Sequence, residues 1–282
     1  MGDRNAPGAM EVITTPDYEA MVIGAHPDDD DFGAGATSAL WSKQGKKVVW
    51  VVMTDGTEGS EVPSLIDTEL MLTREQEQRM ACEVLGVQAV EFLRFSDGHL
   101  TNNETTRKAL VRLIRKYRPR VVFTHDPSEH ILAPDPYEKP DETGHLNHPD
   151  HRATGNIVLD AIFPYVGNPR SYRELLVEGL LPYRVHELYL FFTDRDNTYV
   201  DVTETIALKA KGLQCHITQF GPQAEISERI HKWAAETAQE AKEKKGLDMQ
   251  YAEAFRRIKL YIPKKPEEEQ LPESEAEAEA EA

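Results

Sequence analysis

Short apolar runs alternate with longer amphipathic segments along the first half of the chain. Runs of strand length occupy residues 20–25, 47–53, 89–93 and 121–124. The segments between them, residues 34–44, 70–85 and 105–118, place apolar side chains at a spacing near 3.6, which is typical of helices. Strands that alternate with helices form βαβ units, and such units build a parallel sheet. The pattern predicts an α/β fold with a mostly parallel sheet flanked by helices.

The second half of the chain has a less regular pattern. Residues 127–147 form a long loop with four prolines, and loops of this length are often functional. Residues 153–162 predict a helix that opens near Pro149, where proline suits the first turn, and residues 163–182 look irregular. Two further strands are predicted at residues 185–193 and 198–202, followed by a helix from residue 202 onward and an amphipathic helix at residues 223–243.

The domain organisation follows from these patterns. Residues 18–262 are expected to form a single domain, preceded by a flexible segment at residues 1–17. Residues 263–282 are rich in glutamate and have almost no apolar side chains to bury. Segments of that composition do not fold alone, so we expect a disordered acidic C-terminal tail.

The charge of the chain restricts its partners. The net charge is −17 over 282 residues, but eight glutamates lie in residues 266–282, so the body carries only about −9. Nonspecific nucleic-acid binding needs lysine and arginine to neutralise phosphates, so we expect no nucleic-acid partner. No apolar run reaches the roughly 18 residues of a membrane helix, and the N-terminus lacks a signal-peptide core. We therefore expect a cytoplasmic protein without membrane contact, and a homo-oligomer stays possible.

The chain has only two cysteines, Cys82 and Cys215, each in a segment predicted to be helical. Two are too few for a disulfide framework or a thiolate zinc site. We expect both to be buried, reduced thiols, as free cysteines usually are.

Candidate chemistry begins directly after the first apolar run. Residues 25–35 contain one histidine and four consecutive carboxylates, Ala-His-Pro-Asp-Asp-Asp-Asp-Phe-Gly-Ala-Gly. In open α/β sheets, ligands bind beyond the carboxyl ends of the strands. Polar residues also follow the other three strands, at residues 54–56, 95–98 and 125–126. His26 and Asp29 stand three positions apart across a proline, so a tight loop can aim both at one ion while Asp28 serves as a general base.

A second cluster, residues 144–151, supplies the histidines that the first cluster lacks. A catalytic zinc site typically has three protein ligands and one open position, and a histidine and a carboxylate joined by a distant histidine fit that count. His148 and His151 are also three positions apart, so one can bind the ion while the other acts as an acid or an electrostatic stabiliser. Asp150 would orient one of the two rings.

Each cluster also has an ordinary interpretation. A run of aspartates is typical of a solvated helix start, and an isolated His-x-x-His is commonly a surface feature. Gly33-x-Gly35 is a weak phosphate-loop signal, because the dinucleotide fingerprint needs a third glycine where the chain has Ser38.

The two clusters resemble the LmbE/PIG-L-like zinc-dependent deacetylases, which remove N-acetyl groups from N-acetylglucosamine-type sugars. The resemblance rests on His26-Pro27-Asp28-Asp29 with the glycines behind it, and on His148-Pro149-Asp150-His151. Weaker matches are Thr54-Asp55-Gly56, Arg74 with Glu77, Leu85-Gly86-Val87, Asp97-Gly98, and Lys211 with His216 and Gln219. Two positions depart from the family pattern, Asp30 in place of glutamate and Ala36 in place of glycine.

The resemblance implies a Rossmann-like fold, an amino-sugar substrate and a role for each site residue. His26, Asp29 and His151 would bind zinc, although the same donors suit iron, and Asp28 would be the general base. His148 would stabilise the oxyanion or protonate the leaving amine, with Asp150 orienting it. Arg74 and Asp97 would contact the sugar. The alternative for Arg74 is an ion pair on a helix surface, and His125, His145 and His216 are assigned to the pocket wall or the core.

Three other functions fit the same residues. One is an amidase that acts on a thiol conjugate of an amino sugar, which the family also includes. A second is a phosphoesterase with two metal ions, for which Asp30, Asp31, Asp55 and Asp126 could supply further ligands. The third is a sugar-binding relative without catalysis.

Overall fold

The computed structural model describes residues 10–132, 144–221 and 225–261. The predicted tail, residues 263–282, and residues 1–9 of the predicted flexible segment lie outside these ranges. The strands are β1 (Tyr18–Gly24), β2 (Val48–Thr54), β3 (Ala89–Phe95), β4 (Pro119–His125), β5 (Ile131–Leu132), β6 (His145–Leu146), β7 (Glu187–Phe191), β8 (Thr198–Asp201) and β9 (Ala252–Lys259). The helices are α1 (Asp29–Lys43), α2 (Asp67–Leu85), α3 (Glu104–Tyr117), α4 (Pro149–Asp160), the π-helix η1 (Ala161–Val166), α5 (Glu174–Val177), α6 (Ile206–Leu213), α7 (Ile217–Phe220) and α8 (Glu225–Lys245).

A seven-stranded sheet runs through the centre of the molecule in the order β3-β2-β1-β4-β7-β9-β8. The first five strands of that order are parallel, whereas β9 runs antiparallel to both β7 and β8. The short strands β5 and β6 form a separate antiparallel pair. The predicted α/β class, with a mostly parallel sheet flanked by helices, is confirmed.

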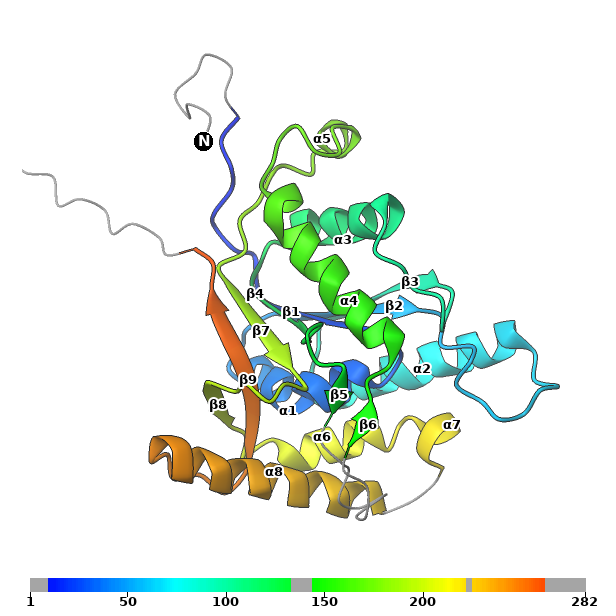
Figure 1. Cartoon of the computed structure of the whole chain (residues 1–282), viewed down its shortest axis with the longest axis vertical. Helices are drawn as coiled ribbons and strands as arrows, with labels where there is room; N and C mark the ends of the chain where they lie inside the picture. Colours follow the sequence, from blue (N-terminus) through cyan, green and yellow to red (C-terminus); the bar gives the residue numbers. More distant parts are fainter. Residues whose placement is uncertain (1–9, 133–143, 222–224, 262–282) are drawn as a thin grey trace, which may run out of the picture.

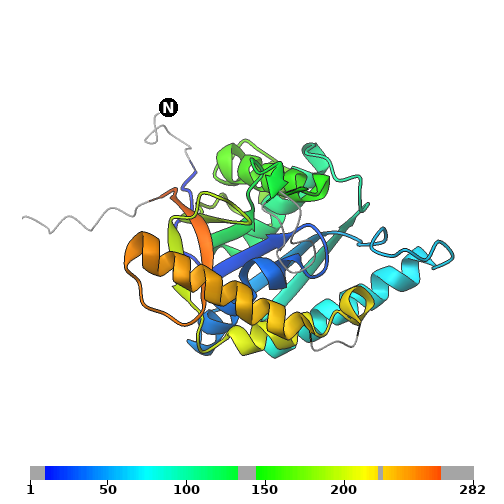
Figure 2. The same ribbon diagram turned by 60° about the horizontal axis from the view of Figure 1, so that its bottom comes forward.

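Alternate side chains of the central strands enter two cores on opposite faces of the sheet. Met21 of β1 joins a core that contains Leu110 of α3 and Ile157 of α4. Its neighbour Val22 joins a different core, which contains Trp41 of α1. Figures 1 and 2 show α3 and α4 on one face, and α1, α2, α6 and α8 on the other. Because both faces are covered, the central strands are apolar throughout, which made them recognisable in the sequence.

The C-terminal half differs most from the sequence prediction. Strand β9 was not predicted, and α6 begins at Ile206 rather than directly after β8. The segment predicted to be irregular, residues 163–182, contains the end of η1 and the short helix α5. Within the predicted flexible segment, Ile13 donates its N–H to the carbonyl of Pro182 (2.9 Å) and accepts from the N–H of Arg184 (2.9 Å). Residue 13 is therefore held against the domain by backbone pairing.

The described helices also bear on the cysteines and on membrane insertion. Cys82 on α2 is buried as expected, whereas Cys215, just after α6, is only partly buried, and both are free thiols. In residues 10–132, 144–221 and 225–261, we find no helix with the length and apolar character that crossing a membrane requires.

The order of the strands reverses between β1 and β4. From β1 the chain builds β2 and β3 on one side, and β4 and β7 lie on the other. In open α/β sheets, ligands bind outside the carboxyl ends of the strands at such a point. His26 follows β1 and His125 ends β4, so the topology brings both histidines to this place.

Candidate active site

The turn between β1 and α1 fixes the positions of two adjacent carboxylates. Asp29 opens α1, and its Oδ2 accepts hydrogen bonds from the N–H groups of Ala25 (3.0 Å) and His26 (2.8 Å). Asp28 has a left-handed backbone conformation with φ of 108° and donates its N–H to Oε1 of Gln78 (2.8 Å). A residue other than glycine is strained at such a φ, and strain of this kind is concentrated at functional sites.

The remaining carboxylates of the acidic run are buried rather than solvated. Asp31 accepts a hydrogen bond from Nε2 of Gln78 (2.7 Å) and lies 3.1 Å from Nε2 of the fully buried His216. Asp30 is also fully buried, and burial raises its pKa well above the ordinary value. The acidic run begins a helix, as its ordinary interpretation predicts, but its carboxylates are buried and not exposed to solvent. His216 has the core position predicted for it.

The second cluster lies at the N-terminus of α4. Pro149 is the first residue of the helix, and Nδ1 of His148 accepts a hydrogen bond from the N–H of Asp150 (3.2 Å). The carboxylate of Asp150 accepts from the N–H groups of Gly98 (2.7 Å) and Leu100 (3.1 Å). Asp150 therefore positions His148 through its backbone N–H. Its carboxylate holds the loop after β3 and lies 3.5 Å from Nε2 of His26, whereas the prediction placed it against the ring of His148 or His151.

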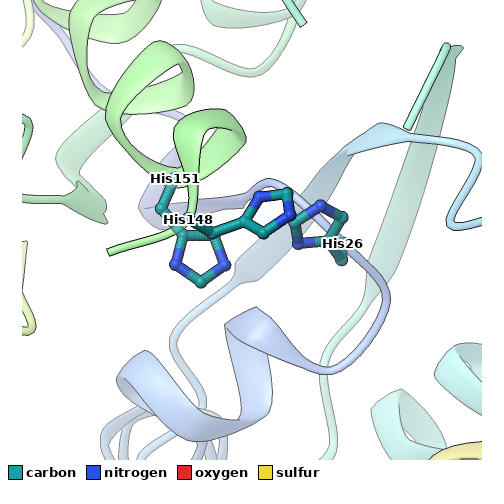
Figure 3. Close-up of side chains that lie close together, drawn as sticks. All are labelled: His26, His148 and His151. Atoms are coloured by element: carbon teal, nitrogen blue, oxygen red, sulfur yellow. The ribbon is translucent and has the colours of Figure 1, made fainter. Parts of the chain in front are cut away.

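The two clusters meet in space although they are far apart in the sequence. Asp29 Oδ2 lies 3.3 Å from Nδ1 of His26, and Asp29 Oδ1 lies 3.2 Å from Nε2 of His151. The rings of His26 and His151 have centroids 5.3 Å apart. Figure 3 shows the rings of His26, His148 and His151 gathered together, with His26 from the loop after β1 and the other two from the start of α4.

Within the described residues, the donor atoms form three overlapping groups, each with atoms within 4.8 Å of one another. They are His26 with His148 and His151, Asp29 with His125 and His151, and His26 with Asp97 and Asp150. The predicted ligands His26, Asp29 and His151 are split between the first two groups. All three are close together, and His151 belongs to both.

These residues fit a divalent metal ion. Two donors that each lie about 2.0–2.1 Å from a tetrahedral ion are about 3.3 Å apart, which is the separation of Asp29 from both His26 and His151. Both ring nitrogens of His125 are buried without a hydrogen-bond partner among the described residues. Buried polar atoms without a partner are rare, and an ion is one of their ordinary explanations. The imidazole and carboxylate donors suit zinc and iron.

The charges of the cluster explain its pKa shifts. Burial alone would raise the pKa of Asp29, but the imidazoles of His151 and His125 outweigh burial and hold it well below the usual value. Burial alone would lower the pKa of His26, but the carboxylates of Asp150, Asp29 and Asp97 raise it well above the usual value. Burial lowers the pKa of His125 to about 4, so this ring is neutral at physiological pH.

Arg74 and Asp97 brace the loops around the cluster. Arg74 is 3% exposed and donates to the carbonyls of Gly56 (2.7 Å) and Pro27 (2.8 Å), and it lies 3.3 Å from Oδ2 of Asp28. The alternative prediction of a helix-surface ion pair for Arg74 is therefore wrong. Burial raises the pKa of Asp28 to about 6, although Arg74 opposes this shift. Asp97 Oδ1 lies 2.9 Å from Nε2 of His26.

A single cavity of about 660 Å³ collects the predicted site residues. It is lined by His26, Asp28, Asp29, Arg74, Asp97, His148 and His151, with His145 in its wall as predicted. Aromatic side chains also line it, namely Phe32, Phe192, Phe220 and Trp233. Asp150 is not among the lining residues, because its carboxylate is buried under the loop after β3.

Three of the four carboxylates suggested for a second metal ion, Asp31, Asp55 and Asp126, have other partners. Asp55 accepts hydrogen bonds from Thr57 and from the N–H of Asp97, and Asp126 accepts from Thr193 and lies 3.1 Å from Arg195. In the part of the chain that the structure describes, the donor groups contain none of the four residues Asp30, Asp31, Asp55 and Asp126. The geometry thus gives no support to the phosphoesterase with two metal ions.

His125 is buried, as its predicted wall or core role requires, and it also belongs to a donor group with Asp29 and His151. One residue that shapes the site was missed. Gln78 was not singled out at all, because nothing in a helical Gln indicates that it holds Asp28 and Asp31 from 47 or more positions away.

Comparisons with known proteins agree with this geometry. The family model of GlcNAc-PI de-N-acetylases, PIG-L, matches residues 21–162. The chain is 32% identical over 202 residues to a diacetylchitobiose deacetylase from Thermococcus kodakarensis, with 72% of this chain and 70% of that protein covered. It is 28% identical over 234 residues to a 1D-myo-inositol 2-acetamido-2-deoxy-alpha-D-glucopyranoside deacetylase from Salinispora arenicola, with 70% and 68% covered.

A solved structure of high similarity is the N,N'-diacetylchitobiose deacetylase from Pyrococcus horikoshii. It matches with a TM-score of 0.71 at 32% identity, and the match covers 86% of this chain and 84% of that chain. The match extends well beyond the loops that carry the two clusters, so sequence motif and fold agree. The resemblance seen in the sequence is confirmed, and the chain belongs to the PIG-L family of de-N-acetylases.

Proposed function

We propose that this chain is a metal-dependent deacetylase that removes the N-acetyl group of an N-acetylglucosamine-type amino sugar or its conjugate. The observation that carries the proposal is the meeting of two remote loops, one after β1 and one at the start of α4, in a single cavity. Family membership supports the type of reaction, because the similar proteins are named as deacetylases of acetylated amino sugars.

The metal ligands in this proposal are His26, Asp29 and His151, and the ion is zinc, with iron as the alternative. A divalent ion at such a site lowers the pKa of water to about 7 and polarises a carbonyl oxygen. Asp29 is prepared for this role because two backbone N–H groups fix its Oδ2. Nδ1 of His151 lies 3.1 Å from Oδ1 of Asn147, which orients the ring and leaves Nε2 toward Asp29.

Asp28 is the general base, and it accepts a proton from the attacking water. It lines the cavity next to the metal ligands, and the guanidinium group of Arg74 lies 3.3 Å from its carboxylate. A base works best when its pKa lies near the operating pH, and burial raises the pKa of Asp28 to about 6.

His148 is the donor that faces the developing oxyanion or the leaving amine. Its Nδ1 accepts a hydrogen bond from the N–H of Asp150, and a neutral imidazole that accepts at one nitrogen carries its proton on the other. The proton of His148 therefore sits on Nε2. Burial and the neighbouring rings of His26 and His151 lower the pKa of His148, which favours this neutral form. A donor to an oxyanion contributes roughly 3 to 4 kcal/mol to the transition state.

Arg74 and Asp97 are proposed to contact sugar hydroxyl groups, since both line the cavity, Asp97 beside His26 and Arg74 beside Asp28. The cavity is larger than the reacting acetamide needs, and pockets of this size hold a whole small ligand. This leaves room for a conjugated sugar and does not identify it.

The proposal is tested by acetate release from a panel of N-acetylated amino sugars. The panel contains free sugars, sugars joined to a second ring, and analogues with longer N-acyl groups. Cleavage of the longer analogues is followed by the free amine that it produces, which separates the deacetylase from the thiol-conjugate amidase. We expect acetate from at least one member, loss of release on chelation, and recovery on addition of zinc or iron(II). No acetate from any member, with binding retained, would favour the non-catalytic relative.

A further inference from the structure

Asp28 stands directly before α1 in a conformation that differs from the usual one for such an aspartate. An aspartate at this position usually has an extended backbone, and its carboxylate accepts a hydrogen bond from an N–H group of the first helical turn. Asp28 instead has a φ of 108°, and its carboxylate makes no such capping bond and lines the cavity. A left-handed backbone costs free energy at a residue other than glycine, so other contacts must hold it.

Two side chains of α2 hold the peptide group that precedes Asp28. Arg74 donates to the carbonyl of Pro27 (2.8 Å), and Oε1 of Gln78 accepts from the N–H of Asp28 (2.8 Å). This carbonyl and this N–H belong to one planar peptide group. Side chains one helical turn apart therefore fix both of its polar ends. Rotation of this peptide group would change the φ of Asp28, which is the strained angle.

The amide of Gln78 is fixed on its other side as well. Gln78 is fully buried, and its Nε2 donates to Oδ2 of Asp31 (2.7 Å), which lies 3.1 Å from Nε2 of the buried His216. A backbone N–H only donates and a carboxylate only accepts, so these two partners determine which end of the amide faces each of them. Rotation of the amide would break both bonds, and neither bond is to a proposed metal ligand.

We propose that Gln78 is a positioning residue for the general base. Its amide holds the backbone of Asp28 in the strained conformation that keeps the carboxylate in the cavity, whereas Gln78 itself does not line that cavity. The inference rests on the base role proposed for Asp28, although that role can stand without it. A misplacement of about 1 Å can lower the rate of a reaction about 100-fold, so the effect should appear in catalysis and not in binding.

Hydrogen exchange at the amide of Asp28 tests this geometry without any substrate. In the ¹⁵N-labelled full chain, nuclear magnetic resonance should show slow exchange at Asp28 in the wild type and faster exchange in Gln78→Met. Methionine has about the volume of glutamine, but it is a poor acceptor and cannot donate to Asp31. Gln76→Met, on the exposed side of α2, is the matched control and should exchange like the wild type. Equal exchange at Asp28 in the wild type and Gln78→Met would overturn the inference, whichever sugar the protein binds.

Steady-state kinetics separate positioning from metal binding and substrate binding. The probe sugar is N,N'-diacetylchitobiose, or another member of the panel if the wild type cleaves it faster. We expect kcat and kcat/KM for acetate release to fall together by about 10- to 100-fold in Gln78→Met, while KM and bound zinc stay at the wild-type level. A fall caused by loss of zinc or by a raised KM alone would refute the inference. No acetate from the wild type on any sugar would refute the proposed function, and the exchange measurement would still decide the role of Gln78.

A double-mutant cycle shows whether Gln78 acts through Asp28. In the Asp28→Ala background, Gln78→Met should lower the residual rate by less than about twofold, because the group that it positions is already absent. A further loss as large as that in the wild-type background would mean that Gln78 acts by another route, against the inference. Gln78→Leu is made in parallel and should behave in the same way. Circular dichroism establishes that the variants fold, and unfolding of both would assign Gln78 to stability alone and reject the positioning role.

Discussion

Asp28 and Asp29 are neighbours in the chain, yet their surroundings shift their pKa values in opposite directions. Burial raises the pKa of Asp28 to about 6, although Arg74, His216 and His26 oppose this shift. Asp29 lies between His125 and His151 and accepts two backbone N–H groups, and its pKa is held well below the usual value. Titratable neighbours whose pKa values are pushed apart usually have separate catalytic duties. This contrast supports a base role for Asp28 and a ligand role for Asp29.

The first prediction concerns Asp28. Asp28→Ala should keep the metal ion and lower kcat by about 10²–10⁴, the usual contribution of a general base. Metal content by mass spectrometry and acetate release on the same sample check both parts. A variant that hydrolyses as fast as the wild type would remove Asp28 from the base role.

The second prediction concerns His148. His148→Gln should lower kcat by about 10²–10³, as loss of an oxyanion donor does, while KM and metal content change little. Steady-state kinetics and metal analysis measure these quantities. His148 also lies in a donor group with His26 and His151, so loss of the ion in this variant would show that it is a ligand rather than a donor to substrate.

At the scale of elements, the sequence best predicted the strands whose two faces are both covered by helices. The central strands and α1 to α3 were recognised because their apolar positions are continuous or helically spaced. Strand β9 carries Glu253, Arg256 and Arg257 among its apolar residues, and such a pattern has no strand signature. Its charges are matched only by distant partners: Glu253 accepts from Lys209 (2.7 Å), and Arg257 donates to Glu187 (2.5 Å). The position of β9 therefore depends on tertiary contacts, which a local sequence pattern does not reveal.

Glu187 connects three strands of the sheet through ion pairs. On β7, it accepts hydrogen bonds from Arg120 of β4 (2.7 Å) and Arg257 of β9 (2.5 Å). Burial alone would raise its pKa, but the two guanidinium groups outweigh burial and lower it. A carboxyl group whose folded pKa is depressed stabilises the fold above its unfolded pKa, and this contribution is lost as the pH falls through the folded pKa.

The third prediction follows from the lowered pKa of Glu187. Below the ordinary glutamate pKa of about 4.3, the free energy of unfolding of the wild type should fall more steeply with decreasing pH than that of Glu187→Gln. Urea unfolding between neutral and acidic pH measures the two slopes. Glu178→Gln is the control, because Glu178 pairs with Arg112 at the surface, where ion pairs contribute little. Equal slopes in wild type and Glu187→Gln would contradict this account of the three strands.

At the scale of the whole molecule, the sequence predicted which loops meet but not how they meet. The motifs around His26 and His151 identified the candidate ligands, and the rule that parallel strands end at one edge brought their loops together. The position of His125 beside Asp29, and of Trp233 from α8 in the cavity wall, depends on packing between segments more than 90 residues apart. Neither of the two motifs indicates such packing.

The fourth prediction is that the metal ion stabilises the whole chain. An ion that binds only the folded state adds about 2.7 kcal/mol at a free concentration of 100 times its Kd. For a chain of this size, Tm should rise by roughly 5 to 10 °C. Thermal denaturation with and without zinc measures the shift, and addition of chelator should reverse it. An unchanged Tm at saturating zinc would argue against an ion held between the two loops.

The central claim is that loops far apart in the sequence hold one divalent ion beside Asp28. Its most direct test is the metal content of the wild type compared with His26→Ala and His151→Ala, each loaded with zinc and then dialysed. We predict one ion per chain in the wild type and a large loss in both variants, because each removes a ligand from a different loop. One ion per chain at wild-type affinity in either variant would contradict the claim.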